Sequence, residues 1–136
     1  MPNQKTLSII KPDAVKAGNV DEINLVIENS GLKILEKKEL KLSKEEAQQF
    51  YAIHSDKPFY KELCEFMTSG PIIVQMLEGE NAIELYRKVM GATNPEEAEE
   101  NTIRKKFATS IQENAVHGSD SIDNALKEIN FFFKDV

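Results

Sequence analysis

The chain has 136 residues and a mass of 15.4 kDa, and this length predicts one domain covering residues 1–136. It is 40% hydrophobic and 29% charged, and it lacks the run of about 18 apolar residues that a membrane span needs. The net charge of −6 argues against a broad surface for nucleic acid or for an anionic membrane, but it permits a small anionic ligand.

The first half of the chain shows alternating strand and helix patterns. Residues 5–11 predict a strand that aligns Leu7, Ile9 and Lys11 on one face, so the lysine lies where the strand ends. Helical spacing between Val20 and Ile27 predicts a helix that stops before Gly31. Residues 32–42 then predict an antiparallel strand with a solvated middle.

Ser43 and Glu46 form a capping box, which predicts the start of the next helix. One face of this helix is expected to carry the side chains of Ala47, Phe50, Tyr51 and His54.

The second half predicts an apolar helical stripe over residues 59–67, a strand at 72–77 and a helix containing Ile83, Tyr86 and Met90, with Arg87 on its flank. Residues 91–113 are polar, and loops of this length are usually functional or disordered. The last strand is expected at 114–117. The inward face of the final helix is predicted to hold Ile122, Ala125, Leu126 and Ile129.

This order of elements predicts an α+β protein with a ferredoxin-like βαββαβ core, in which helices cover a four-stranded antiparallel sheet. RNA-recognition modules share the order. They need exposed aromatic and basic residues on the sheet, and the predicted strands show none, so an RNA-binding protein is the weaker alternative.

His117 lies between a short apolar strand and a cluster that starts a helix. Neutral imidazole has an available lone pair near pH 7 and forms a reactive phosphoramidate, so this histidine is a candidate nucleophile. Lys11, Arg87 and Arg104 lie on three separate segments and together could surround a triphosphate, although each alone could be an ordinary surface charge.

The chain resembles the nucleoside diphosphate kinase family over nearly its whole length. Asn114, His117, Gly118, Ser119 and Asp120 match the motif Asn-x-x-His-Gly-Ser-Asp, and residues 10–14 resemble the family's N-terminal motif. The resemblance implies transfer of the terminal phosphate of ATP to nucleoside diphosphates by a ping-pong mechanism through phosphorylated His117.

The resemblance also implies roles around the nucleotide. Glu128 would support the histidine, Lys11 would contact phosphate, and Ser119 would cap the last helix, alone or while binding substrate. Tyr51 is expected beside the pocket, with core packing equally compatible with its position. The remaining matches to nucleotide-binding positions are Phe59, Leu63, Arg87, Thr93, Arg104 and Asn114.

Phe59 would stack on the base with Leu63 beside it, although an aromatic residue at a helix start can also be core. The implied cofactor is Mg²⁺ held mainly by nucleotide phosphates and water, with Asp120 a candidate contact to a metal-bound water. The implied assembly is a homo-oligomer of dimers, either a tetramer or a hexamer. We read His54 and Cys64 as structural residues, and the lone cysteine and the absence of a secretory pattern predict a cytoplasmic location.

The sequence departs from the family where glycine is usual at Asp21 and Asn101, and where Lys105 and Lys106 follow Arg104. Asp and Asn tolerate a positive φ better than most residues, so the fold should survive these changes. A nucleotide-binding regulatory protein that has lost turnover is a second alternative, which the intact cluster around His117 argues against.

Overall fold

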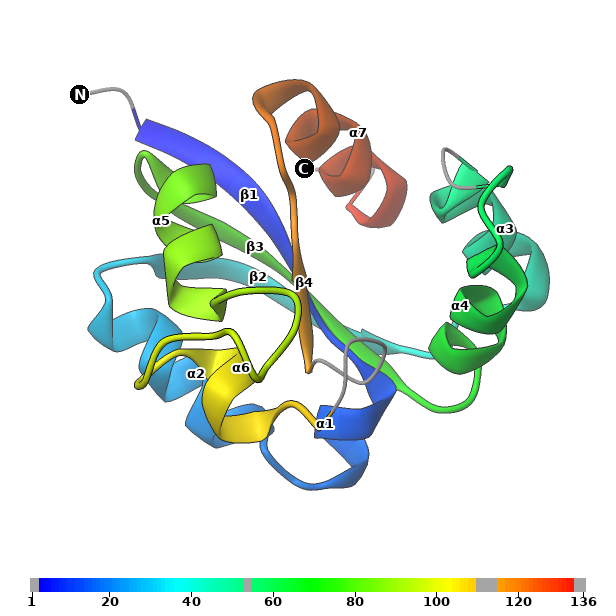
Figure 1. Ribbon diagram of the computed structural model, residues 1–136. Helices are drawn as coiled ribbons and strands as arrows, with labels where there is room; N and C mark the ends of the chain where they lie inside the picture. The colour runs from blue at the N-terminus through cyan, green and yellow to red at the C-terminus, as the bar shows by residue number, and fades with distance from the viewer. Residues whose placement is uncertain (1–2, 53–54, 110–114, 134–136) are drawn as a thin grey trace.

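The computed structural model describes residues 3–52, 55–109 and 115–133 and has a four-stranded sheet at its centre (Figure 1). The strands are β1 (Asn3–Ile10), β2 (Lys33–Leu40), β3 (Ile72–Glu80) and β4 (Val116–Gly118). They lie in the order β2-β3-β1-β4, and all neighbouring strands are antiparallel. This is the predicted ferredoxin-like α+β arrangement, so the predicted fold class is confirmed.

Helices cover both faces of the sheet. They are α1 (Pro12–Lys16), α2 (Val20–Asn29), α3 (Lys44–Phe50), α4 (Tyr60–Met67), α5 (Ala82–Met90), α6 (Ile103–Phe107) and α7 (Ile122–Phe132). In Figure 1, α2 and α5 lie on one side of the sheet, and α3, α4 and α7 lie on the other. In the described ranges, no helix combines the length and the apolar composition that crossing a bilayer requires.

The alternation of β1 divides the interior into two clusters. Leu7 and Ile9 pack with α3, α4 and α7, whereas Ile10 belongs to the cluster under α2 and α5. Ser8 also faces α5, where its hydroxyl lies 2.7 Å from the hydroxyl of buried Tyr86. Successive strand residues point to opposite faces, so one strand supports both layers.

The predicted start of α3 is confirmed. The Glu46 backbone N–H donates to the Ser43 hydroxyl over 3.1 Å, and the Ser43 N–H donates to the Glu46 carboxylate over 2.9 Å. The helix ends at Phe50 with Tyr51 as its C-cap, so the predicted continuous face does not extend as helix beyond that point. His54 lies outside the described residues.

Several predicted boundaries move. β1 ends one residue before Lys11, which is the N-cap of the unpredicted α1. α6 lies inside the polar stretch 91–113 that showed no helical periodicity. The last strand begins at Val116, later than predicted, because Ala115 adopts a positive φ of 73°, outside the backbone angles of a regular strand.

The predicted inward face of α7 is half wrong. Ala125 and Ile129 are buried, but Ile122 and Leu126 are each 58% exposed. The helix instead turns its C-terminal aromatic residue Phe132 into the core, which rotates the other two side chains toward solvent.

Candidate active site

His117 is the middle residue of β4 and pairs with Ile9 of β1. Its imidazole is partly buried, and Nε2 lies 3.0 Å from Oε1 of Glu128 on α7. The ring also meets Phe50 of α3 in an edge contact, with 5.7 Å between ring centroids. Two helices on the same face of the sheet therefore fix the orientation of the ring.

Glu128 joins the histidine to β1 through Ser119. The buried Ser119 hydroxyl donates to Oε1 of Glu128 over 2.7 Å and accepts from the Leu7 backbone N–H over 3.3 Å. An ionised carboxylate only accepts hydrogen bonds, so it orients the N–H of a neutral imidazole toward itself. With that proton on Nε2, the lone pair of His117 is on Nδ1.

Ser119 is not the helix cap that the sequence predicted. The N-cap of α7 is Ser121, whose hydroxyl accepts from the Asn124 backbone N–H over 3.1 Å. Ser119 lies too early for this duty because α7 begins at Ile122. Its hydroxyl is engaged with Leu7 and Glu128 instead.

The three predicted cations converge from separate elements. Arg87 is exposed on α5, whereas Arg104 on α6 and Lys11 after β1 are buried. Arg104 donates to the carbonyl oxygen of Gly91 over 3.0 Å and to that of Val116 over 2.9 Å.

The buried cations also influence one another. Burial lowers the pKa of Arg104, and nearby Arg87 lowers it further. Burial lowers the pKa of Lys11 to about 8, Arg104 lowers it as well, and the Asp13 carboxylate opposes them. This clustering of positive charge indicates a site built for an anion.

Asp120 lies between these cations and the histidine. The Asn124 side chain donates to its Oδ1 over 2.6 Å, and this hydrogen bond is the main cause that lowers the pKa of Asp120. Burial opposes the shift, while Arg87 and His117 add to it. Asp120 is therefore an ionised acceptor at neutral pH.

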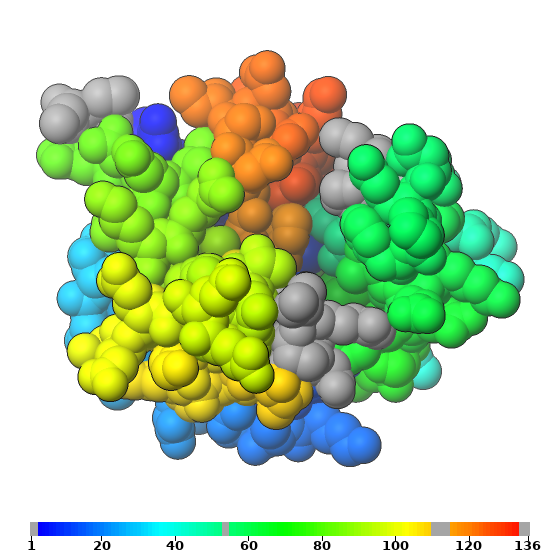
Figure 2. Space-filling model, viewed as in Figure 1, coloured from blue at the N-terminus to red at the C-terminus, as the bar shows by residue number. Residues whose placement is uncertain are grey.

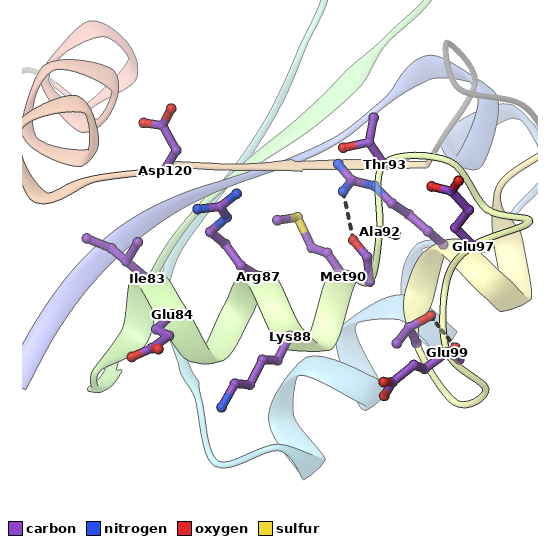
Figure 3. A pocket seen from close by; sticks show the side chains of 13 residues that line it. Ile83, Glu84, Arg87, Lys88, Met90, Ala92, Thr93, Glu97, Glu99 and Asp120 are labelled. Carbon is purple, nitrogen blue, oxygen red and sulfur yellow. Dashed lines mark hydrogen bonds between the residues drawn. The ribbon is translucent and has the colours of Figure 1, made fainter.

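Two hollows meet at Asp120. One of about 850 Å³ is lined by Arg87, Thr93 and Arg104, and the other of about 320 Å³ is lined by Phe50, His117 and Glu128. Figure 3 shows Arg87 pointing toward β4 and Asp120, whereas Lys88 points away from them. In Figure 2, the yellow surface after α5, the orange surface of β4 and α7, and the green α3–α4 surface enclose this region.

Two glycines allow the close packing of this region. A Cβ at Gly118 would lie 2.7 Å from side-chain atoms of Tyr86 and Met90, so β4 can lie against α5 only with glycine there. A Cβ at Gly91 would lie 2.6 Å from the Thr102 hydroxyl, and Gly91 has a positive φ of 88°.

Tyr51, Phe59 and Leu63 are not among the residues that line the two hollows. Tyr51 is buried in the core, and its pKa is raised by burial and by the Glu128 carboxylate. Phe59 is 48% exposed before α4, Leu63 is partly buried on α4, and both line neither of the two hollows. Asn114 lies outside the described residues.

The departures from the family motifs have separate explanations. Asn101 has a positive φ of 72°, the conformation for which asparagine is a tolerated substitute for glycine. Asp21 lies in the first turn of α2, where a carboxylate is favourable. Lys105 and Lys106 are exposed on α6 and leave Arg104 turned inward.

Three neighbours of the site were not predicted from the sequence. Phe50 was assigned to a core face, but it also borders His117. Asn124 follows Asp120 by four residues, a spacing that signals contact at the start of a helix. Asp13 lies in the matched segment 10–14, but its hydrogen bond to the backbone of Ala115 had no local signal because the partners are 102 residues apart.

A protein-held metal centre has no candidate within the described ranges. No group of three or more His, Cys, Asp or Glu side chains there is arranged to hold a metal ion. Among the carboxylates that line the two hollows, Asp120 is shared by both.

Known proteins resemble this chain over nearly its whole length. The sequence model of the family described as nucleoside diphosphate kinase matches residues 4–136. A nucleoside diphosphate kinase from Wolbachia sp. subsp. Drosophila simulans is 58% identical over 135 residues, covering 99% of this chain and 97% of the relative. One from Campylobacter curvus is 60% identical over 130 residues, covering 96% and 95%.

Solved structures show the same fold. The nucleoside diphosphate kinase of Aquifex aeolicus matches with a TM-score of 0.95 at 41% identity, over 97% of this chain and 96% of that one. The enzyme of Halobacterium salinarum, solved in complex with CDP, matches with a TM-score of 0.93 at 37% identity, over 98% and 90%.

Proposed function

Because the chain belongs to the nucleoside diphosphate kinase family, we propose that its His117 carries the phosphoryl group between nucleotides. The protein is a nucleoside diphosphate kinase, a phosphotransferase that converts ATP and a nucleoside diphosphate into ADP and a nucleoside triphosphate. The observation that carries the assignment of the histidine is its 3.0 Å contact with Glu128.

In the first half-reaction, the Nδ1 lone pair of His117 attacks the γ-phosphorus of ATP. The bond from this phosphorus to the β,γ-bridging oxygen breaks, its electron pair stays on that oxygen, and ADP leaves. Glu128 accepts the Nε2 proton in a hydrogen bond that strengthens as the ring becomes positive. In the second half-reaction, a terminal oxygen of the diphosphate attacks the same phosphorus, the P–N bond breaks, and its electron pair returns to Nδ1, which restores neutral His117.

The cations stabilise the charge that moves during this transfer. Arg87, Thr93 and Arg104 line the larger hollow and would bind the phosphates there. Lys11, whose charge interacts with Arg104, would add a third cation, and Asn114 would add a hydrogen bond. Ser119 holds Glu128 in place, and Tyr51 supports the same wall from the core.

Mg²⁺ bound by the nucleotide fits the residues present. Mg²⁺ keeps several waters and commonly uses substrate phosphates as ligands, so the nucleotide itself would supply most of its ligands. The ion neutralises phosphate charge when bound. Ionised Asp120 would hold one of its water molecules.

Phe59 offers an exposed aromatic face for the base, and Leu63, one turn along, offers an aliphatic wall.

We assign the whole chain to one catalytic domain in the cytoplasm, where a free buried Cys64 stays reduced. The enzyme would act as a homo-oligomer of dimers, a tetramer or a hexamer. The open edge of β2 supports such pairing, because β2 pairs only with β3 in the described sheet.

The proposal is tested by incubating the protein with radiolabelled ATP and Mg²⁺ and then with a diphosphate. We expect an acid-labile, base-stable phosphoenzyme that a diphosphate discharges, and none in His117→Ala. Glu128→Gln should form it about 10- to 100-fold more slowly, equivalent to roughly 1.4–2.7 kcal/mol of lost transition-state stabilisation. Substantial exchange by folded His117→Ala would contradict the assignment.

A further inference from the structure

The turn after β1 holds the residue that leads into β4. The Ala115 backbone N–H donates to Oδ2 of Asp13 over 3.1 Å, and the Lys11 backbone N–H donates to the Ala115 carbonyl oxygen over 2.8 Å. Ala115 is fully buried. Both of its backbone polar groups are therefore bound by one short segment, residues 11–13.

Ala115 needs this support because its φ is 73°, in the left-handed region. Such a conformation is sterically unfavourable for an L-residue, and it persists only where neighbouring groups determine it. Val116, the next residue, begins β4 and gives its carbonyl oxygen to Arg104. The direction in which β4 leaves this turn thus depends on Ala115.

We propose that Asp13 is a positioning residue for phosphoryl transfer, because its carboxylate holds Ala115 in the conformation that places His117 on β4. His117 follows Ala115 by two residues, and β4 has only three residues to hold the register. This inference rests on the function proposed for His117. The carboxylate acts on the reacting nitrogen through the backbone and does not touch the substrate.

The charge of Asp13 adds a second, separable effect on Lys11. Burial and the Arg104 cation lower the pKa of Lys11 to about 8, and Asp13 is the group that raises it. Removing the negative charge should lower this pKa further. Lys11 would then lose its proton, and its attraction for phosphate, at a lower pH.

The two effects are separated by two substitutions. Asp13→Asn keeps an oxygen that can accept from Ala115 but removes the charge, whereas Asp13→Ala removes both. Asp21→Asn is the matched control, since Asp21 is an exposed aspartate in the first turn of α2. Ala115→Gly supplies a rescue, because glycine adopts a positive φ without the steric cost.

The measurements are kcat and KM for exchange, and the rate of phosphoenzyme formation, as functions of pH. We expect Asp13→Ala to lower kcat by roughly tenfold or more with little change in KM, since small misplacements of a reacting group have effects of this size. Adding Ala115→Gly should restore part of this loss. Asp13→Asn should stay within about threefold of the unmodified protein below pH 7, with the fall in kcat/KM at high pH moved to lower pH.

The inference would be overturned if Asp13→Ala and Asp13→Asn lost kcat equally and the pH profile of kcat/KM did not move. It would also be overturned if kcat of Asp13→Ala stayed within twofold of the unmodified protein. If Asp13→Ala fails to fold, Ala115→Gly with and without Asp13→Ala decides, and an equal kcat in these two variants would overturn the inference. An active His117→Ala would defeat the proposed function. An inactive His117→Ala beside an unaffected Asp13→Ala would defeat only the role of Asp13.

Discussion

Lys11 illustrates how a single residue can be suited to an anion before the anion binds. It is only 7% exposed at the end of β1, beside Arg104 and Asp13. Water cannot solvate its charge fully, so a phosphate that replaces water there gains more than it would on an open surface. The same burial makes the charge sensitive to pH near neutrality.

We expect kcat/KM to fall as the pH rises through about 8, because a lysine whose pKa is lowered loses its proton before an ordinary lysine does. The measurement is kcat/KM for ATP between about pH 6 and about pH 10. Lys11→Gln should be weakly active and should lack this fall. A profile that stays flat to about pH 10 would show that the Lys11 charge is not needed.

Phe59 has an exposed ring that can stack on the nucleotide base. Stacking accepts every base, so purine and pyrimidine diphosphates, ribo and deoxyribo, should all be substrates, with purines modestly favoured by their larger area. Phe59→Ala should raise KM for all of them and narrow the purine preference, whereas Ile122→Ala, on the exposed face of α7, should not. A preference above roughly a thousandfold for one base would reveal a polar specificity pocket.

The sequence pattern of α7 predicts a helix, but packing against the rest of the protein determines which face of that helix is buried. Its apolar residues lie on more than one side of the helix, and the side that carries Ile129 and Phe132 is the buried one. Lys38 of β2 reinforces this choice, because its Nζ donates to the Phe132 carbonyl oxygen over 2.9 Å and lies 5.3 Å from the Phe133 ring centroid.

We therefore expect Ile122→Ser and Leu126→Ser to change the free energy of unfolding by no more than about 0.5 kcal/mol, as is usual for surface positions. Ile129→Ala should lower it by about 2–5 kcal/mol, because it removes buried methyl groups and leaves a cavity. Urea denaturation of the three variants measures these differences. A large loss in Leu126→Ser would mean that its side chain is covered in solution.

Elements with a strong local signal could be predicted from the sequence. The capping box at Ser43 and the 3.6-residue spacing of Ile83, Tyr86 and Met90 are such signals, and α3 and α5 follow them. α1 and α6, with five residues each, are too short to show a period and depend on tertiary contacts. The face of α7 required knowledge of Phe132, which periodicity alone does not rank above Leu126.

Some residues of the site could be predicted from the sequence, whereas their long-range contacts could not. Resemblance to a family identified His117 and Glu128, and the structure brings the two side chains together. No pattern in the sequence could pair Asp13 with Ala115, because the hydrogen bond joins distant segments through backbone geometry. Motifs identify residue types, whereas the positive φ of Ala115 and the hydrogen bond that stabilises it are visible only in the folded chain.

At the scale of the whole molecule, the open edge of β2 and the neighbouring Leu25 predict how subunits pair. Leu25 on α2 is 58% exposed, and a long unpaired strand edge favours pairing with another chain. We expect the protein to sediment as a tetramer or a hexamer, and Leu25→Glu to yield smaller species with unchanged circular dichroism.

Leu126→Glu is the matched control, since Leu126 is equally exposed at 58% but lies on α7. Sedimentation velocity of both variants measures the assembly. If Leu126→Glu dissociates the oligomer and Leu25→Glu does not, the subunits pair through α7 rather than through β2.

The buried charge of Lys11 has a thermodynamic consequence for the free enzyme. Unfolded chains hold this lysine with an ordinary pKa of 10.5, whereas the folded protein holds it at about 8. Between these values the unfolded state binds more protons, so the free energy of unfolding gains a contribution as the pH rises from 8 toward 10.5. At neutral pH the native state thus maintains the charge at the expense of its own stability. A bound nucleotide, by compensating that charge, should act as a folding stabiliser as well as a substrate.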